Sequence, residues 1–373
     1  MTLDKKSLII SLLYCVIPFI AAAQYSNAFF GSCKLLFAGD IMQHIQQLEN
    51  AEQNDGTYSY SSYYRYITPT VKDADIAVAN LETTIGRGNY SGYPAFCAPD
   101  SFLYAIKDAG FDVLLFANNH CLDRGRRGVL HTLGMLDSLG IAHCGVYRSP
   151  EEREERHPLI IKSGGIRIAI LNYTYGTNGI KVPEPITVNL IDKKSIAADI
   201  EKARRLRADV IIACMHWGDE YTSLPPEEIV ELSEWLIAEG VDHIIGNHPH
   251  VIQPIEIREE ANKSYRHAVV YSTGNLVSNM SQRGTDGGLT VKMLLKKRFS
   301  YTRLSSLEYL LTWIAPKGAD GRRDFTILPA RSVTPEKKSL AARKLKTFLD
   351  DTEELFRQHN KGEIKEAEWL FSF

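Results

Sequence analysis

The sequence has few cysteines and arranges them in no recognisable framework. No two of them form a CxxC pair or a dense group. A network of disulfides is therefore not indicated, although an exported protein could form one or two bridges. We assign the cysteines no chemistry. The six are Cys15, Cys33, Cys97, Cys121, Cys144 and Cys214.

The chain also lacks an excess of charge of either sign. Its formal net charge is -2 over 373 residues, so it presents no basic field of the kind that binds nucleic acid. The length and the apolar content allow one large domain or two modest ones with an ample core. We therefore expect a globular protein with no nucleic-acid partner.

The N-terminus has the form of a secretory signal. Lys5 and Lys6 precede an apolar run from Leu8 to Ile20, and three alanines at 21–23 offer a cleavage site. The run is short for a membrane span. An uncleaved anchor and a lipoprotein are the alternatives. We predict a signal peptide at 1–23 and export to the periplasm or the cell envelope.

Short apolar runs alternate with amphipathic stretches along most of the chain. Continuous apolar runs are typical of strands buried on both faces, and alternation with helices favours a layered α/β fold. The expected strands are 34–40, 75–80, 112–119, 166–173, 208–216, 242–247 and 268–275. The expected helices are 99–110, 128–140, 195–207 and 225–240. Further on, antiparallel strands are expected at 288–295, 307–315 and 323–329, and a terminal helix at 335–358.

Polar residues follow five of the expected strands at their carboxyl ends, where open α/β sheets bind ligands. Carboxylate, imidazole and amide groups together suit Mn, Fe or Zn better than calcium. Each of these polar groups has a plainer explanation when taken alone: a helix cap, a surface charge, a core histidine or a turn. To explain all five groups in this way, however, would require five independent coincidences. The five groups are Asp40; Asn80 with Glu82; Asn118, Asn119, His120 and Asp123; His216; and Asn247, His248 and His250.

Two local arrangements are expected to aim these groups at one site. Pro249 should hold His248 extended, so that His248 and His250 point the same way. Asp40 and His44 are four residues apart at what reads as a helix start, which would place them on one helical face. These arrangements would bring imidazole and carboxylate groups together at little ordering cost.

The motifs resemble those of the bacterial capsule-synthesis CapA family, which is associated with poly-γ-glutamate and has a calcineurin-like metallophosphatase fold. The resemblance rests on six segments in family order. They are "FAGDIM" (37–42), "DIAVANLET" (75–83), "YPAFCAPDSFLYAIKDAGFDVLLFANNHCLDRG" (93–125), "HWGDEY" (216–221), "GNHPHVIQPIE" (246–256) and "YSTGNLVSN" (271–279).

This resemblance implies a four-layer α/β/β/α sandwich with a site for two divalent metal ions (Mn, Fe or Zn). It implies a domain at 33–280, with residues 281–373 supplying strands that complete the sandwich and a terminal helix. His120 would be the acid–base group, oriented by Asp123. Trp217, Gly218 and Glu220 would shape the pocket, and His44 is a further candidate ligand. The implied metal ligands are Asp40, Glu82, Asn119, His216, His248 and His250.

The resemblance leaves two functions open. One is a metal-dependent hydrolase of a small phosphoester or of a γ-glutamyl or peptide bond. The other is a non-enzymatic accessory protein that binds a polyanionic polymer or a membrane capsule-synthesis complex. The tyrosine-rich segment at 57–67 could be a polymer platform, although packing of aromatic rings onto the sheet is the plainer explanation.

Overall fold

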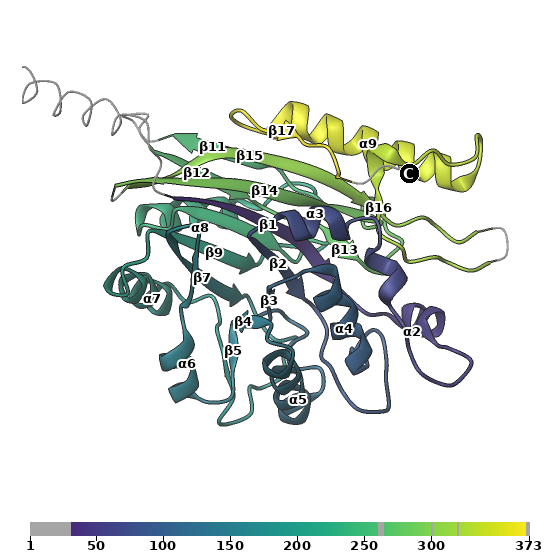
Figure 1. The fold of residues 1–373 in the computed structure, drawn as a ribbon, viewed down its shortest axis with the longest axis horizontal. Coiled ribbons are helices and arrows are strands. Elements are labelled where there is room, and N and C mark those ends of the chain that lie inside the picture. The colour runs from purple at the N-terminus through teal and green to yellow at the C-terminus, as the bar shows by residue number, and fades with distance from the viewer. Residues whose placement is uncertain (1–30, 260–264, 300, 319–320, 371–373) are drawn as a thin grey trace, which may run out of the picture.

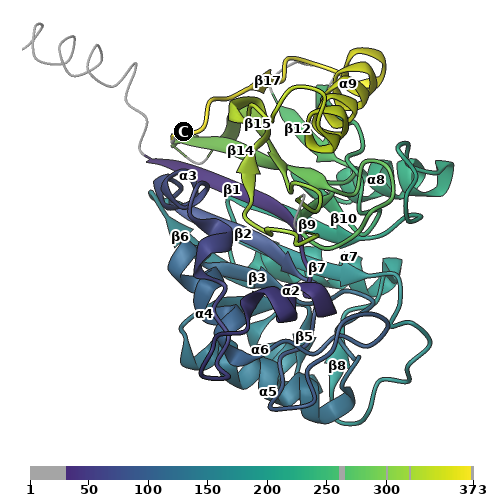
Figure 2. The same cartoon turned by 90° about the vertical axis from the view of Figure 1, so that its right-hand side faces the viewer.

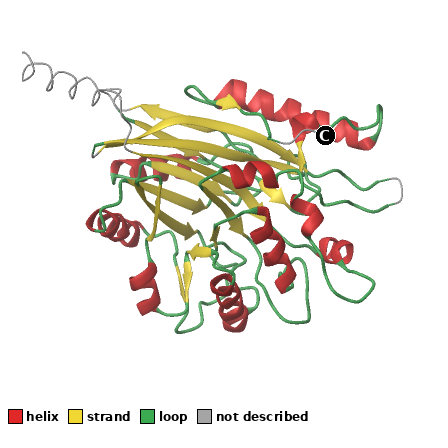
Figure 3. Ribbon diagram, viewed as in Figure 1, coloured by secondary structure: helices red, strands yellow, loops and turns green. Residues whose placement is uncertain are grey.

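The computed structural model describes residues 31–259, 265–299, 301–318 and 321–370. Two β-sheets lie face to face, with helices around them (Figures 1 and 3). The predicted signal peptide lies outside the described residues. Within the described ranges, no helix is both long enough and apolar enough to cross a membrane.

The first sheet is mixed and is centred on β1 (Gly31–Ile41), which pairs in parallel with β2 and in antiparallel with β14. Strands from the C-terminal part of the chain therefore extend the sheet that the N-terminal part begins. The order across the sheet is β16 (Leu328–Pro329), β15 (Tyr301–Trp313), β14 (Gly287–Arg298), β1, β2 (Ile76–Leu81), β3 (Val113–Leu115) and β4 (Ala142–Cys144). In addition, β13 (Asn275–Val277) pairs with β1, and β17 (Lys365–Glu366) pairs with β15.

The second sheet has a parallel centre formed by β7, β9, β10 and β12, so the carboxyl ends of these strands meet at one edge. Its order is β11 (Ile255–Glu259), β12 (Arg266–Val270), β10 (His243–Asn247), β9 (Val210–His216), β7 (Ile166–Thr174) and β6 (Leu159–Ser163). A small separate sheet pairs β5 (Val146–Tyr147) with β8 (Thr187–Val188).

Helices cover the outer faces of both sheets, which confirms the predicted four-layer sandwich (Figure 2). On the first sheet pack α3 (Thr68–Asp73), α4 (Asp100–Ala109) and α5 (Gly125–Ser138). On the second sheet pack α7 (Lys193–Arg205) and α8 (Glu227–Ala238). The other helices are α2 (Ile45–Ala51), α6 (Pro150–Arg156) and α9 (Leu340–His359).

The pleat of β1 explains how one strand serves two cores. Cys33, Leu35 and Phe37 enter the core between the sheets, whereas Leu36 and Ala38 face the helices. Successive side chains of a strand point to opposite faces, so a strand buried on both faces must be apolar throughout. Because residues 35–38 are apolar on both faces, this part of β1 can lie in the middle of the sandwich.

Three predictions from the sequence can be compared with the observed fold. The strand expected at 323–329 is reduced to β16, two residues long. The tyrosine-rich segment supplies Tyr60, Tyr63 and Tyr64 to the core, fully buried, so packing explains it and a polymer platform does not. The division at residues 33–280 and 281–373 stays a prediction.

Candidate metal centre

The predicted ligands come from the carboxyl ends of strands in both sheets. Register aligns them: Asp40 lies opposite Asn80 between β1 and β2, and His216 lies opposite Asn247 between β9 and β10. All six predicted metal ligands are buried. Strand ends from two sheets thus converge on one interior site.

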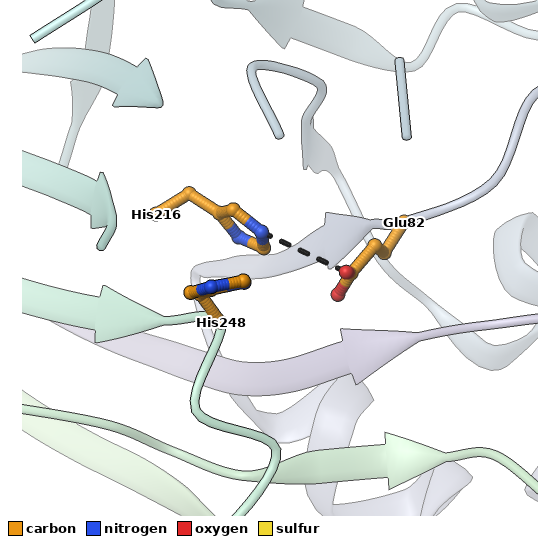
Figure 4. A group of neighbouring side chains, drawn as sticks. All are labelled: Glu82, His216 and His248. Carbon is orange, nitrogen blue, oxygen red and sulfur yellow. Dashed lines mark ion pairs between the residues drawn. The ribbon is translucent and has the colours of Figure 1, made fainter. Parts of the chain in front are cut away.

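The first cluster consists of Glu82, His216 and His248, whose ligand atoms all lie within 4.8 Å of one another. Figure 4 shows the three side chains meeting, with a dashed line joining His216 Nε2 and Glu82 Oε1, which lie 3.6 Å apart. The amide oxygen of Asn119 lies 2.8 Å from the same His216 nitrogen. Four of the six predicted ligands therefore meet at this position.

The second cluster consists of Asp40, Glu82 and His250, whose ligand atoms also all lie within 4.8 Å of one another. His250 Nδ1 lies 3.2 Å from Asp40 Oδ2, and His250 Nε2 lies 3.7 Å from Glu82 Oε1. Glu82 belongs to both clusters. Its carboxylate therefore occupies the place that a ligand shared by two cations would need.

The chemistry of Glu82 fits a bound cation. The side chain is fully buried, and among the described residues neither of its oxygens has a hydrogen-bond partner. A buried polar atom without a partner costs about 1–3 kcal/mol, and more when the group is charged. His248 Nδ1 is also buried without a partner. Divalent ions held by these atoms would remove both costs, so the residues present fit the expected metals.

Two of the imidazoles are kept neutral by their surroundings. Burial, with a smaller contribution from the neighbouring histidines, lowers the pKa of His248 to about 3. Burial and the same neighbours hold the pKa of His216 well below its usual value. Burial and Asp40 raise the pKa of Glu82. A neutral imidazole has a lone pair to donate, as a metal ligand must.

Two asparagines orient the ligands. Asn275 donates its amide protons to the His250 and Thr285 carbonyl oxygens, so its own oxygen, 3.0 Å from His250 Nδ1, is the acceptor. The proton of His250 then lies on Nδ1, and the lone pair of Nε2 is left facing Glu82. Asn80 donates to Asp40 Oδ1 at 2.8 Å. Such partners of a metal ligand fix its tautomer and orientation.

The expected local geometry of the histidine pair is wrong. His248 has a φ of 101° and His250 a φ of 58°, so neither is extended. Backbone strain of this kind persists only where surrounding contacts impose it, and it concentrates at functional sites. With this backbone, His248 belongs to the first cluster and His250 to the second, and their ring centroids lie 6.0 Å apart.

The expected helical face for Asp40 and His44 is also wrong. Asp40 lies within β1, which runs to Ile41, and α2 begins only at Ile45. His44 is the N-cap residue of α2, and its Nδ1 lies 3.2 Å from the backbone nitrogen of Asn279. Neither cluster includes His44. Continued pairing of β1 with β2 and β13 explains why the strand extends past Asp40.

His120 and Asp123 lie beside the clusters. The His120 Nδ1 atom lies 2.8 Å from Asp123 Oδ2, which also accepts the Phe96 backbone N–H at 2.7 Å. The ring of Phe96 packs edge-on against His120, with centroids 4.6 Å apart. Asp123 and Phe96 thus fix the imidazole, and Nε2 is the nitrogen left to exchange a proton.

The resemblance placed Glu220 at the pocket but not among the metal ligands. Its carboxylate lines the cavity and forms a third group with His248 and His250, although the side chain is exposed. In the sequence, the signal for this role is an acidic residue four positions after His216. Trp217, expected at the pocket, is fully buried in the core and donates to the Tyr271 carbonyl oxygen. Its indole therefore supports the strand ends from behind.

A cavity of about 360 Å³ gives access to the site. Its walls include His44, His120, Glu220 and His250. The proposed acid–base residue and one ligand of the second cluster, His250, therefore face the same space, which is the arrangement that a reaction at the metal centre requires.

Comparison with known proteins agrees with the motifs. Residues 34–280 match the model of the family described as bacterial capsule synthesis protein PGA_cap. The chain belongs to this family. Among PGA_cap relatives, the PGA biosynthesis protein CapA of Bacillus subtilis is 28% identical over 305 residues, covering 78% of this chain and 76% of the relative. The capsule biosynthesis protein CapA of Bacillus anthracis is 26% identical over 278 residues, covering 70% of this chain.

The match spans 64% of the length of the Bacillus anthracis CapA protein. Among solved structures, a calcineurin-like phosphoesterase from Bacillus subtilis superposes with a TM-score of 0.41 and 14% identity, covering 88% of this chain and 99% of that chain.

Proposed function

We propose that this member of the PGA_cap family is an exported, metal-dependent hydrolase that acts in capsule or poly-γ-glutamate synthesis. Its substrate is a phosphoester or a γ-glutamyl or peptide bond. One observation carries the proposal: His120, held by Asp123, opens into the same cavity as the metal ligand His250. A site that only held a structural ion would need no acid–base residue facing that space.

The residues that would hold the ions are those of the two clusters, with Glu82 shared between them. Bound there, divalent ions would polarise a phosphoryl or acyl oxygen and neutralise negative charge on it. Asn275 and Asn80 would keep His250 and Asp40 aimed at the ions. All of these side chains come from strand ends, which makes the site rigid before substrate arrives.

His120 would act on the leaving group. Asp123 holds Nδ1, so a proton carried on Nε2 can pass to the departing oxygen or nitrogen. The His120 side chain is 5% exposed and that of Asp123 is 2% exposed, so water does not compete for their hydrogen bond. The pair therefore delivers its proton at one fixed place in the cavity.

The test is His120→Ala, measured in four ways: metal content, melting temperature, hydrolysis of phosphoester and γ-glutamyl substrates, and capsule formation. General acid–base groups contribute about a hundredfold or more to the rate. We expect that loss with metal content and melting temperature unchanged. Asp123→Asn is the companion variant and should show a smaller loss, because it leaves the imidazole in place.

Two results would decide against hydrolysis. A stable, metal-loaded His120→Ala protein that still supports capsule formation would favour the accessory role, in which the protein binds polymer or a membrane capsule-synthesis complex. A lower melting temperature without a selective loss of activity would make His120 a structural residue.

A further inference from the structure

A second cavity, of about 490 Å³, lies where the 85–97 loop meets the start of α5. Three arginines and one histidine line it: Arg87, Arg124, Arg127 and His131. Among the described residues, no carboxylate side chain lines this space. We call it the arginine cavity.

Two of the arginines are available to a ligand. Arg124 is held in the wall, because its Nη2 donates to the Asn89 carbonyl oxygen at 3.0 Å and to the Ser91 hydroxyl. Arg87 and Arg127 are exposed, and no carboxylate in the described part of the chain pairs with either of them. Their charge is therefore not neutralised locally.

His131 forms a fixed part of the cavity wall, and the carboxylate that holds it does not line the cavity. His131 Nε2 lies 2.7 Å from Asp100 Oδ1, and Asp100 belongs to α4, outside the lining. Three guanidinium groups around one hollow create a positive potential that favours an anion. Guanidinium groups bind carboxylate and phosphate through paired N–H donors, which makes these two groups the matching ligands.

The arginine cavity is joined to the metal centre by two short stretches of chain. Arg87 follows Glu82 by five residues, a span of at most about 18 Å when fully extended. Arg124 directly follows Asp123, which orients His120. One elongated molecule could therefore reach both places, with its reacting bond at the metal centre.

We propose that the arginine cavity is an anion subsite, which takes a carboxylate or phosphate group on a part of the substrate remote from the bond that is cleaved. The link to cleavage rests on the proposed hydrolase function; the binding of the anion does not. Carboxylate and phosphate share one feature: each offers two negatively charged oxygens on one central atom, which Arg87 and Arg127 can bind.

The experiment is calorimetric titration of the full chain with two probes, inorganic phosphate and a γ-linked glutamate trimer. The variant is the double substitution Arg87→Gln and Arg127→Gln. Arg126→Gln is the matched control, since Arg126 lies next to Arg127, is exposed and does not line the cavity. We expect the double variant to bind at least about tenfold more weakly, the effect of one charge-assisted hydrogen bond, and the control to bind like the wild type.

A third protein, His216→Ala, separates this proposal from the hydrolase. Anion binding that survives in His216→Ala and is lost in the double variant supports the subsite even if no hydrolysis is found. Binding that is lost in His216→Ala and retained in the double variant places the anion at the metal centre and overturns the subsite. Failure of the wild type to bind either probe also overturns it.

The two probes distinguish the sources of the anion. Tighter binding of the trimer than of phosphate indicates a polycarboxylate chain, and the reverse indicates a phosphate group. An unchanged melting temperature in the double variant shows that the loss is not unfolding; should it fall, Arg87→Gln alone, on the loop, is the variant to titrate.

Discussion

Glu82→Gln is expected to change the stability of the protein in opposite directions with and without divalent ions. In the ion-free protein, the carboxylate is fully buried, near Asp40, and neither oxygen has a partner among the described residues. Burial and Asp40 raise the pKa of Glu82, so at neutral pH the folded protein bears the cost of an acid that would ionise freely in the unfolded chain. Glutamine has nearly the same volume and cannot ionise, so Glu82→Gln should raise the free energy of unfolding at pH 7 by at least about 1.4 kcal/mol, the equivalent of one pKa unit.

The ion-loaded protein should respond in the opposite way. Ions at 100 times their dissociation constant stabilise a folded protein by about 2.7 kcal/mol. Glu82 is shared by both clusters, so its replacement removes a ligand from each. The variant should lose most of this stabilisation, and elemental analysis should find less bound metal than in the wild type.

The assay is denaturant unfolding of chelated and ion-loaded protein. Glu256→Gln is the matched control, because Glu256 is also buried but is paired with Arg258 at 2.8 Å and with Lys361 at 2.7 Å. Glu256→Gln should lower the free energy of unfolding equally in the chelated and the ion-loaded protein. Our reasoning about Glu82 is refuted if the chelated variant is less stable than chelated wild type, or if it binds metal as the wild type does.

Three further results are expected. Glu220→Gln should weaken metal binding, whereas Asp219→Asn, its exposed neighbour outside the clusters, should not; equal effects would mean that only general charge matters. Burial would raise the pKa of Asp199, but the bonds and charges of His157 and Arg153 lower it from 3.8 to about 2. Above pH 3.8, Asp199 therefore contributes about 2 kcal/mol to the free energy of unfolding, and this contribution is lost as the pH falls toward 2. Asp199→Asn should remove this pH dependence from unfolding curves measured across that range. Mass spectrometry of exported protein should find a chain that starts near Gln24; an intact Met1 would contradict the predicted cleavage.

The sequence alone determined the elements of the fold. The strands buried on both faces were recognisable because their buried parts must be apolar, as residues 35–38 of β1 and 210–215 of β9 are. The helices were recognisable from their ends, such as α4, which begins after Pro99 and ends at Gly110 with a φ of 104°. These features depend on neighbours in the chain, so a local pattern is enough to predict them. The segment expected as a strand at 323–329 does bury Phe325 and Ile327, but the Ile327 backbone N–H donates to the Tyr63 carbonyl oxygen and not to β15. Within this segment, only the two residues of β16 pair with β15, which is why the length of this strand was overestimated.

The sequence also indicated which residues gather at the strand ends, since the carboxyl ends of parallel strands meet at one edge. Only the tertiary structure decided their arrangement. The positive φ of His248 and His250, the position of Asp40 within β1 and the approach of Glu220 all depend on contacts between segments far apart in sequence. Those contacts, and not local preference, set the backbone at each of these residues. For the same reason, the fact that Glu82 is shared between two clusters became visible only when both sheets were in place.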